Sequence, residues 1–338
     1  MRFPSRSLPL FAACLLATAC TPAEDSSPDQ QQSSSEQSTG AQISKQQQAG
    51  GASSAQQPTS TPTAADQEPQ ELLAGAQISN LVDAASQQLA RTALEGAGLP
   101  KENIDRFFEL VTEYNSAVPT DSLISSGFRD YGTQDPEYDV EALTSAWQKH
   151  HGQRYAGTNC RINTFTLAQS LFSVEDESNP DTSLLFIDEE SLKNAPKEIL
   201  TSAEHQRFDA LYGAIPTTKD QDSGQHIADI KAYAKDRGIT FEDTKARVIS
   251  MFSHDTLTDP ATLFVGHTGV AVPYDGKLLF LEKIAFDMPY QAILVKDMQQ
   301  LNDYLMQKYD DGPGLEYGRP VIFDNGEVIE GMRYAKRS

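Results

Sequence analysis

A polar tract near the N-terminus limits most strongly what this chain can fold into. Residues 21–71 consist mainly of Gln, Ser, Thr, Ala and Pro and contain almost no large apolar side chain. Such a segment cannot bury enough apolar surface to offset the conformational entropy that folding removes. We therefore expect a disordered tether here and a folded part within residues 72–338, which is long enough for one large domain or two small ones.

The first twenty residues, 1–20, have the pattern of a bacterial export signal. Basic residues precede an apolar run, residues 8–19, that is too short for a permanent membrane-spanning helix. Small residues directly before Cys20 resemble the lipobox of bacterial lipoproteins, in which this cysteine carries lipid and becomes the new N-terminus. The resemblance implies a membrane anchor through Cys20 at the periplasmic face of the bacterial cell envelope. Plain secretory cleavage after Ala19 is the alternative.

The acidic balance of the chain limits its partners. The formal net charge is −21, whereas phosphate binding needs a basic surface, so we expect no nucleic-acid partner. The same charge argues against spreading over anionic lipid headgroups. Its simplest role is solubility, and it is compatible with a basic or neutral substrate.

The order of hydrophobic patterns predicts helices first and a sheet afterwards. Helical spacing marks three N-terminal segments, within 78–94, 100–114 and 140–150. Runs rich in β-branched and aromatic residues mark four strands, at 246–252, 262–272, 278–286 and 291–295. Asp275-Gly276 between the second and third run is a hairpin signal. This order predicts an α+β fold with an antiparallel meander, followed by a helix at 297–309.

Cys160 is the only cysteine of the expected folded part. The periplasm oxidises exposed thiols, so a lone cysteine there is either buried and inert or kept for its reactivity. Apolar residues after Cys160 follow helical spacing, and Gly157 and Asn159 precede it as helix-start signals. We expect Cys160 in the first turn of a helix, where free N–H groups and the helix dipole favour a thiolate.

A cysteine nucleophile needs a base and a group that orients the base. Of the six histidines, His267 alone lies within a strongly apolar strand pattern, between Gly266 and Gly269. The next strand carries Glu282 between apolar neighbours, and a buried carboxylate needs a partner. We predict a pair of His267 and Glu282, with Asp287 as the alternative orienting group. The competing interpretation is a structural sheet histidine, with the glutamate bound to a surface Lys or Arg.

These motifs resemble those of the papain-like bacterial cell-wall cysteine hydrolases, which include NlpC-type endopeptidases and CHAP amidases. Residues 266–272 (GHTGVAV) are similar to their histidine strand, and residues 280–283 (FLEK) resemble the CHAP strand that carries a glutamate. Residues 159–165 and 280–291 also resemble a family of uncharacterised bacterial lipoproteins, a domain of unknown function, over most of residues 72–338. The second resemblance implies no activity.

The first resemblance implies a papain-like core on which the N-terminal helices pack, and an amide hydrolase site. Cys160 would be the nucleophile, His267 the base and Glu282 the orienting group. The backbone N–H of the cysteine, with Tyr155 or Asn159, would bind the oxyanion. The implied substrate is an amide bond of peptidoglycan stem peptides, and the reaction needs no cofactor.

The distance along the chain between Cys160 and His267 exceeds that of compact NlpC domains, so residues 175–260 would be a large insertion. No histidine or cysteine pair has the ligand spacing of a zinc site, and we expect no metal. Two other functions remain open. One is a non-catalytic envelope lipoprotein that binds a muropeptide or a protein, and the other is a transglutaminase-like acyl transferase.

Overall fold

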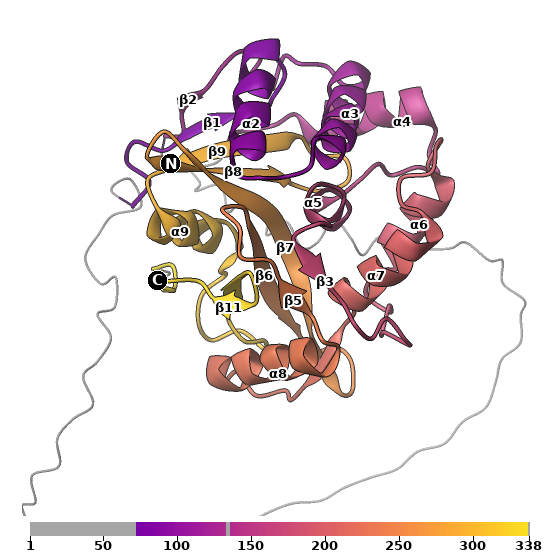
Figure 1. Cartoon of the computed structure of the whole chain (residues 1–338), viewed down its shortest axis with the longest axis vertical. Helices are drawn as coiled ribbons and strands as arrows, with labels where there is room; N and C mark the ends of the chain where they lie inside the picture. The colour runs from indigo at the N-terminus through magenta and orange to yellow at the C-terminus, as the bar shows by residue number, and fades with distance from the viewer. Residues whose placement is uncertain (1–71, 133–135, 337–338) are drawn as a thin grey trace, which may run out of the picture. The chain divides into compact units, whose positions relative to one another are not determined.

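The computed structural model describes residues 72–132 and 136–336 (Figure 1). Within them the fold is mixed α+β, with eight helices and an antiparallel sheet. This confirms the predicted fold class at that level. The expected export signal, Cys20 and the tract 21–71 lie outside the described residues, so the expectations for them remain predictions.

Four long strands form the centre of the sheet. They are β6 (Arg247–Asp255), β7 (Ala261–Tyr274), β8 (Lys277–Lys283) and β9 (Tyr290–Val295). β6 pairs antiparallel with β7, β7 with β8 and β8 with β9, so the predicted meander is present. Asp275 and Gly276 have φ of 47° and 72°, as the tight turn of a twisted hairpin requires.

Strands from both ends of the described chain complete the edges of this sheet. β10 (Val321–Asp324) pairs with β6, and β1 (Gln77–Ser79) pairs with β9. The short strands are β2 (Arg129–Asp130), β3 (Phe172–Ser173), β4 (Ile215–Thr217), β5 (Thr240–Phe241) and β11 (Glu327–Val328). The strand order is β11-β10-β6-β7-β8-β9-β1-β2, and β4 also pairs with β7, whereas β3 and β5 pair with each other.

Helices cover both faces of the sheet. They are α2 (Ala84–Gly96), α3 (Lys101–Ala117), α4 (Val140–His151), α5 (Cys160–Ala168), α6 (Phe186–Asn194), α7 (Ser202–Tyr212), α8 (Ser223–Asp236) and α9 (Met298–Tyr309). Side chains alternate between the two faces of a strand. Val270 and Leu281 share a core with α3 and α5, whereas Ala271 and Phe280 share one with α9. Figure 1 shows α5 and α9 on opposite sides of β7.

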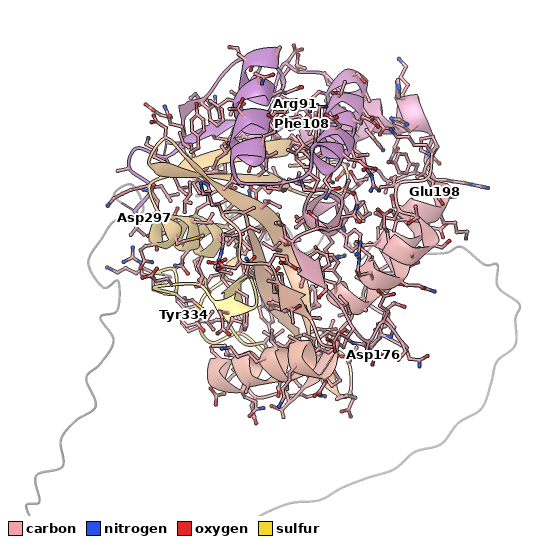
Figure 2. The ribbon with its side chains drawn as sticks, viewed as in Figure 1. Arg91, Phe108, Asp176, Glu198, Asp297 and Tyr334 are labelled. Carbon is pink, nitrogen blue, oxygen red and sulfur yellow. The ribbon has the colours of Figure 1, made fainter. Side chains whose placement is uncertain are left out.

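Helix α5 is almost fully enclosed, since every residue of it except Arg161 is buried. It packs against β7 and α3. Helix α3 is in turn covered by α2, where the Arg91 guanidinium lies 4.3 Å from the centre of the Phe108 ring (Figure 2). The start of α5 is therefore held from several sides.

The first helix begins later than the sequence pattern predicted. Ile78 lies in β1, and α2 begins at Ala84, where the Asp83 side chain accepts hydrogen bonds from the N–H groups of Ala85 and Ser86. A strand of three residues is too short to show alternation, so apolar spacing did not distinguish it from a helical turn.

Residues 175–260, which we expected to be an insertion, contribute directly to the core. Their last part is β6, which lies between β10 and β7. Phe208 of α7 packs edge-on against Phe165 of α5, with ring centres 5.6 Å apart. A segment that supplies a central strand and core side chains is part of the domain body.

None of the helices in the described residues combines the length and the apolar character that crossing a bilayer needs.

Candidate active site

Cys160 is the first residue of α5, in the first turn where the sequence placed it. The Asn159 side chain caps this helix, because its Oδ1 accepts from the Ile162 N–H at 3.0 Å. Cys160 is 5 % exposed. The backbone N–H of Cys160 belongs to the first turn, whose donors lack partners within the helix.

His267 and Glu282 form a buried pair on neighbouring strands. The hairpin register places Glu282 opposite Gly269, two residues from His267 and on the same face of β7. His267 Nε2 lies 2.5 Å from Glu282 Oε2. The two residues are 1 % and 2 % exposed, so this is not a surface glutamate paired with solvent-facing cations.

The start of α5 reaches His267 through an interruption in strand pairing. On one edge of β7, residues 261–263 pair with β4 and residues 269–274 pair with β8. Among the described strands, none pairs with residues 264–268 on that edge. Arg161 uses this interruption, since its Nη1 donates to the Val265 carbonyl at 2.9 Å. The first turn of α5 is thereby fixed beside the histidine.

The thiol of Cys160 and the imidazole of His267 lie close enough for each to shift the pKa of the other. Because Nε2 of this ring is bound to Glu282, Nδ1 is the nitrogen available to the thiol. The structure thus brings the predicted nucleophile, base and orienting group together in one cluster. Their catalytic role stays a prediction.

Charges within the cluster stabilise one another against the effect of burial. Burial alone raises the pKa of Cys160, but the charge of the neighbouring His267 outweighs it, and the pKa is lowered. Burial likewise lowers the pKa of His267, yet Glu282 and Cys160 raise it to about 9. Burial raises the pKa of Glu282, whereas Lys308 and His267 lower it to about 2. These directions favour a thiolate and an imidazolium at neutral pH.

Helix α9 supports the carboxylate of Glu282 from the other side. The Tyr304 hydroxyl donates to its Oε1, and Lys308 Nζ lies 3.4 Å from the same oxygen. Both side chains also contact Gln291 Oε1, at 2.9 and 3.0 Å. Sequence patterns did not indicate these residues, although Tyr304 and Lys308 are four positions apart and so share a helix face.

The alternative orienting group, Asp287, has a different role. Its Oδ2 accepts from Thr144 Oγ1 at 2.6 Å, and its carbonyl accepts from the Tyr114 hydroxyl at 3.0 Å. It therefore ties the loop after β8 to α3 and α4, and the structure favours Glu282 as the partner of His267.

The two predicted oxyanion donors make other contacts. Asn159 Nδ2 donates to Asp188 Oδ1 at 2.7 Å, so both ends of this amide are engaged in holding the helix start. Tyr155 packs in an aromatic group with Trp147 and His151, at ring-centre distances of 5.6 and 5.5 Å. Asn159 thus stabilises the start of α5, and Tyr155 packs against α4.

A buried ion pair links the start of α5 to α6. Asp188 is fully buried, and Arg161 binds it with Nη2 at 2.5 Å and Nε at 3.0 Å. Asp188 therefore holds the two residues on either side of Cys160, namely Asn159 and Arg161. Sequence patterns did not predict this contact, because Asp188 is distant along the chain and lies on a helix with no marked apolar stripe.

The described residues contain one group of side chains with the geometry to hold a metal ion. Glu189, His205 and Asp209 place one ligand atom each within 4.8 Å of the others. The sequence-based expectation of no metal site rested on the spacing of histidines and cysteines, whereas this group contains two carboxylates and one histidine. The group lies on α6 and α7, one residue from Asp188.

The comparisons with known proteins identify a family and no activity. No curated protein and no solved structure matches the chain. A family model described as a domain of unknown function (DUF4300) matches residues 77–329, which run from β1 to the residue after β11. The expected likeness to an uncharacterised family is thereby confirmed, while the likeness to NlpC and CHAP enzymes stays a prediction. The chain belongs to the DUF4300 family.

Proposed function

We propose that this protein is a cysteine-dependent amide hydrolase that uses Cys160, His267 and Glu282. The observation that carries the proposal is the buried imidazole of His267, which binds the carboxylate of Glu282 at 2.5 Å and lies close enough to Cys160 to lower the pKa of its thiol. This arrangement of nucleophile, base and orienting group is the one that acyl-transfer catalysis requires.

In the proposed reaction the Cys160 thiolate attacks the amide carbonyl carbon and forms a C–S bond. The His267 imidazolium donates its proton to the leaving amine as the C–N bond breaks. Neutral His267 then accepts a proton from water as the water attacks the thioester. The C–S bond breaks, the acid is released, and the thiolate of Cys160 and the imidazolium of His267 are restored. Glu282 holds the ring orientation and stabilises the imidazolium, and the Cys160 N–H donates to the oxyanion.

The order of elements supports a papain-like relationship. A cysteine begins a helix that packs on the sheet, a histidine lies on a strand, and the carboxylate lies on the next antiparallel strand. We place the substrate among the amide bonds of peptidoglycan stem peptides. The predicted lipid on Cys20 and the tether 21–71 would hold the domain at the periplasmic face of the envelope, within reach of the wall.

The burial of the three residues favours a second candidate function. None of them is more than 5 % exposed, and the Tyr309 ring stacks on His267 with ring centres 4.7 Å apart. A hydrolase must open this covering before a substrate reaches the thiolate. A non-catalytic envelope lipoprotein, which binds a muropeptide or a protein partner at another surface, needs no such opening.

The pH dependence of thiol alkylation separates the two functions. In the full-length chain with Cys14→Ser and Cys20→Ser, Cys160 is the sole thiol. We expect iodoacetamide to label it rapidly well below the free-thiol pKa of about 8.5, and we expect His267→Ala to abolish the low-pH reaction. The His150→Ala variant, which removes a histidine at the end of α4, serves as the control and should label like the parent.

Slow labelling that rises only in alkali, or labelling only after unfolding, would contradict the hydrolase and favour the binding protein. If the reactive thiol is present, purified muropeptides are the first substrates to incubate with the protein. Cleavage that is lost in Cys160→Ala would identify the amide bond.

A further inference from the structure

Glu189, His205 and Asp209 meet between α6 and α7, outside the thiol cluster. His205 and Asp209 are four residues apart on α7 and therefore share one face of that helix. His205 Nε2 lies 3.0 Å from Glu189 Oε1 and 3.7 Å from Asp209 Oδ1. One imidazole nitrogen and two carboxylates thus converge on a single point from two helices.

The carboxylate of Asp209 is incompletely bound in this arrangement. Its Oδ1 is buried, and it has no hydrogen-bond partner among the described residues. Glu189 places a second carboxylate beside this oxygen, and His205 Nε2, 3.7 Å away, is too far for a normal hydrogen bond to it.

The cluster is also accessible to a small ion from solvent. Glu189 and His205 line a surface groove of about 770 Å³, together with Thr182, Ser183 and Phe186. The side chains of the three residues are 22–36 % exposed. An ion can therefore enter without unfolding the helices.

We propose that Glu189, His205 and Asp209 bind a first-row divalent cation of the Zn²⁺ class. Zinc is commonly held by three protein ligands with nitrogen and oxygen donors, and water completes the coordination. The imidazole disfavours Ca²⁺ and Mg²⁺, which take oxygen ligands. The site goes beyond the proposed hydrolase and does not depend on it.

Metal binding here would stiffen the support of Cys160. Glu189 follows Asp188, which binds Asn159 at 2.7 Å and Arg161 at 2.5 Å on either side of the cysteine. A cation that bridges α6 to α7 would fix the helix turn that carries Asp188. The site is thus positioned to stabilise the domain and to hold the start of α5 in place.

Calorimetric titration with ZnSO₄ tests the site directly. We would use the full-length chain with Cys14→Ser, Cys20→Ser and Cys160→Ala, which leaves no thiol to bind zinc. We expect one saturable equivalent and a rise in the thermal midpoint, since a ligand of the folded state stabilises it. His205→Ala and Asp209→Asn should each weaken binding more than about tenfold.

The controls separate loss of a ligand from loss of the fold. Asp209→Asn keeps the shape of the side chain and removes the repulsion from Glu189, so its midpoint without zinc should not fall. Glu190→Gln on the same helix and His150→Ala on α4 should bind zinc like the parent. Absence of saturable binding, or equal affinity in the parent and in both His205→Ala and Asp209→Asn, would overturn the proposal.

Discussion

Glu282 is the residue on which the charge state of the thiol cluster depends. It binds His267 at 2.5 Å and lies 3.4 Å from Lys308, with its carboxylate buried between them. A buried carboxylate between two basic groups is strongly stabilised in its charged form, and it stabilises them in turn. The properties of His267 and Lys308 therefore change together when this one charge is removed.

The Glu282→Gln variant should lose stability in a pH-dependent way. The pKa of His267 is raised to about 9, so its contribution is complete below its ordinary pKa of about 6.5 and is lost as the pH rises through 9. We expect a loss of about 3 kcal/mol at pH 6, and a smaller difference from wild type at pH 10. Urea unfolding of both proteins across this range measures it.

The opposite end of the pH range provides the internal check for Glu282. Its pKa is lowered to about 2, so the wild-type contribution is present above its ordinary pKa of about 4.3 and is lost as the pH falls through 2. Asp287→Asn, which removes a carboxylate that does not bind His267, should show neither trend. A difference between wild type and Glu282→Gln that stays constant with pH would contradict this description.

Asp188 is the second residue whose loss should have a large effect. Replacement by Asn leaves the Arg161 guanidinium, bound at 2.5 Å in the native protein, without its counter-charge. Breaking one partner of a buried ion pair costs about 3–5 kcal/mol. Chemical denaturation of Asp188→Asn should show a loss of this size.

A double variant tests whether the ion pair itself is needed. Because apolar residues of similar volume often replace a buried pair without loss, Asp188→Leu with Arg161→Met should be more stable than Asp188→Asn alone. If both variants are equally unstable, the effect comes from packing around α6 and not from the unpaired charge.

At the scale of elements, the hairpin of β7 and β8 sets the position of the site. Gly269 lies opposite Glu282, and a Cβ atom there would lie 2.5 Å from the Leu281 carbonyl and from the Phe280 ring. No side chain fits without displacing β8. The close approach of these two strands is what brings His267 to the carboxylate.

Gly269→Ala should therefore weaken both the fold and the thiol cluster. We expect a loss of about 1–3 kcal/mol from overpacking, together with slower alkylation of Cys160 at neutral pH. Gly96→Ala is the matched control, because a Cβ at this helical position meets nothing within 4 Å and alanine favours helix. Normal alkylation in Gly269→Ala would show that the strand pair tolerates the methyl group.

Elements with a local signal could be predicted, and elements that depend on distant partners could not. The meander and the helix of Cys160 follow from residue periodicity and turn residues. The three residues of β1 show no period of their own, because pairing with β9 makes them a strand. Likewise, the roles of Tyr304 and Asp188 arise from contacts between helices and strands that sequence patterns do not encode.

At the scale of the whole molecule, the family match extends across the sheet from one edge region to the other. It begins at residue 77, the first residue of β1, and ends at residue 329, just after β11. The unit that the family shares therefore includes both edges of the sheet, α9 and the segment 175–260. The tract 21–71 lies outside it.

Deletion of residues 21–71 should leave the stability of the domain unchanged. The tract is too poor in apolar residues to join a core, so the thermal midpoint and the alkylation profile of Cys160 should match those of the full chain. Differential scanning calorimetry of both proteins provides the comparison. A midpoint lower by several degrees would mean that the tract packs on the domain.

The sequence predicted the three residues at the centre of the candidate site but not the residues that surround them. Cys160, His267 and Glu282 lie at a helix start and on two strands of one hairpin, each recognisable from nearby residues. The predicted roles of Tyr155 and Asn159 depended on analogy, and both side chains contact other groups. The burial of the cluster depends on packing between distant parts of the chain, and local sequence patterns do not predict such packing.

The late position of α9 has a consequence for the biosynthesis of this protein. The helix that begins at Cys160 is completed at residue 168, whereas Tyr304 and Lys308, which help to keep Glu282 charged, are added near the end of the chain. A chain still emerging from the ribosome lacks these two groups, so the charges of Glu282 and His267 that act on Cys160 are not yet stabilised as in the folded protein. Its thiol then behaves like that of an ordinary unfolded chain, and any reactivity appears only once synthesis and folding are complete.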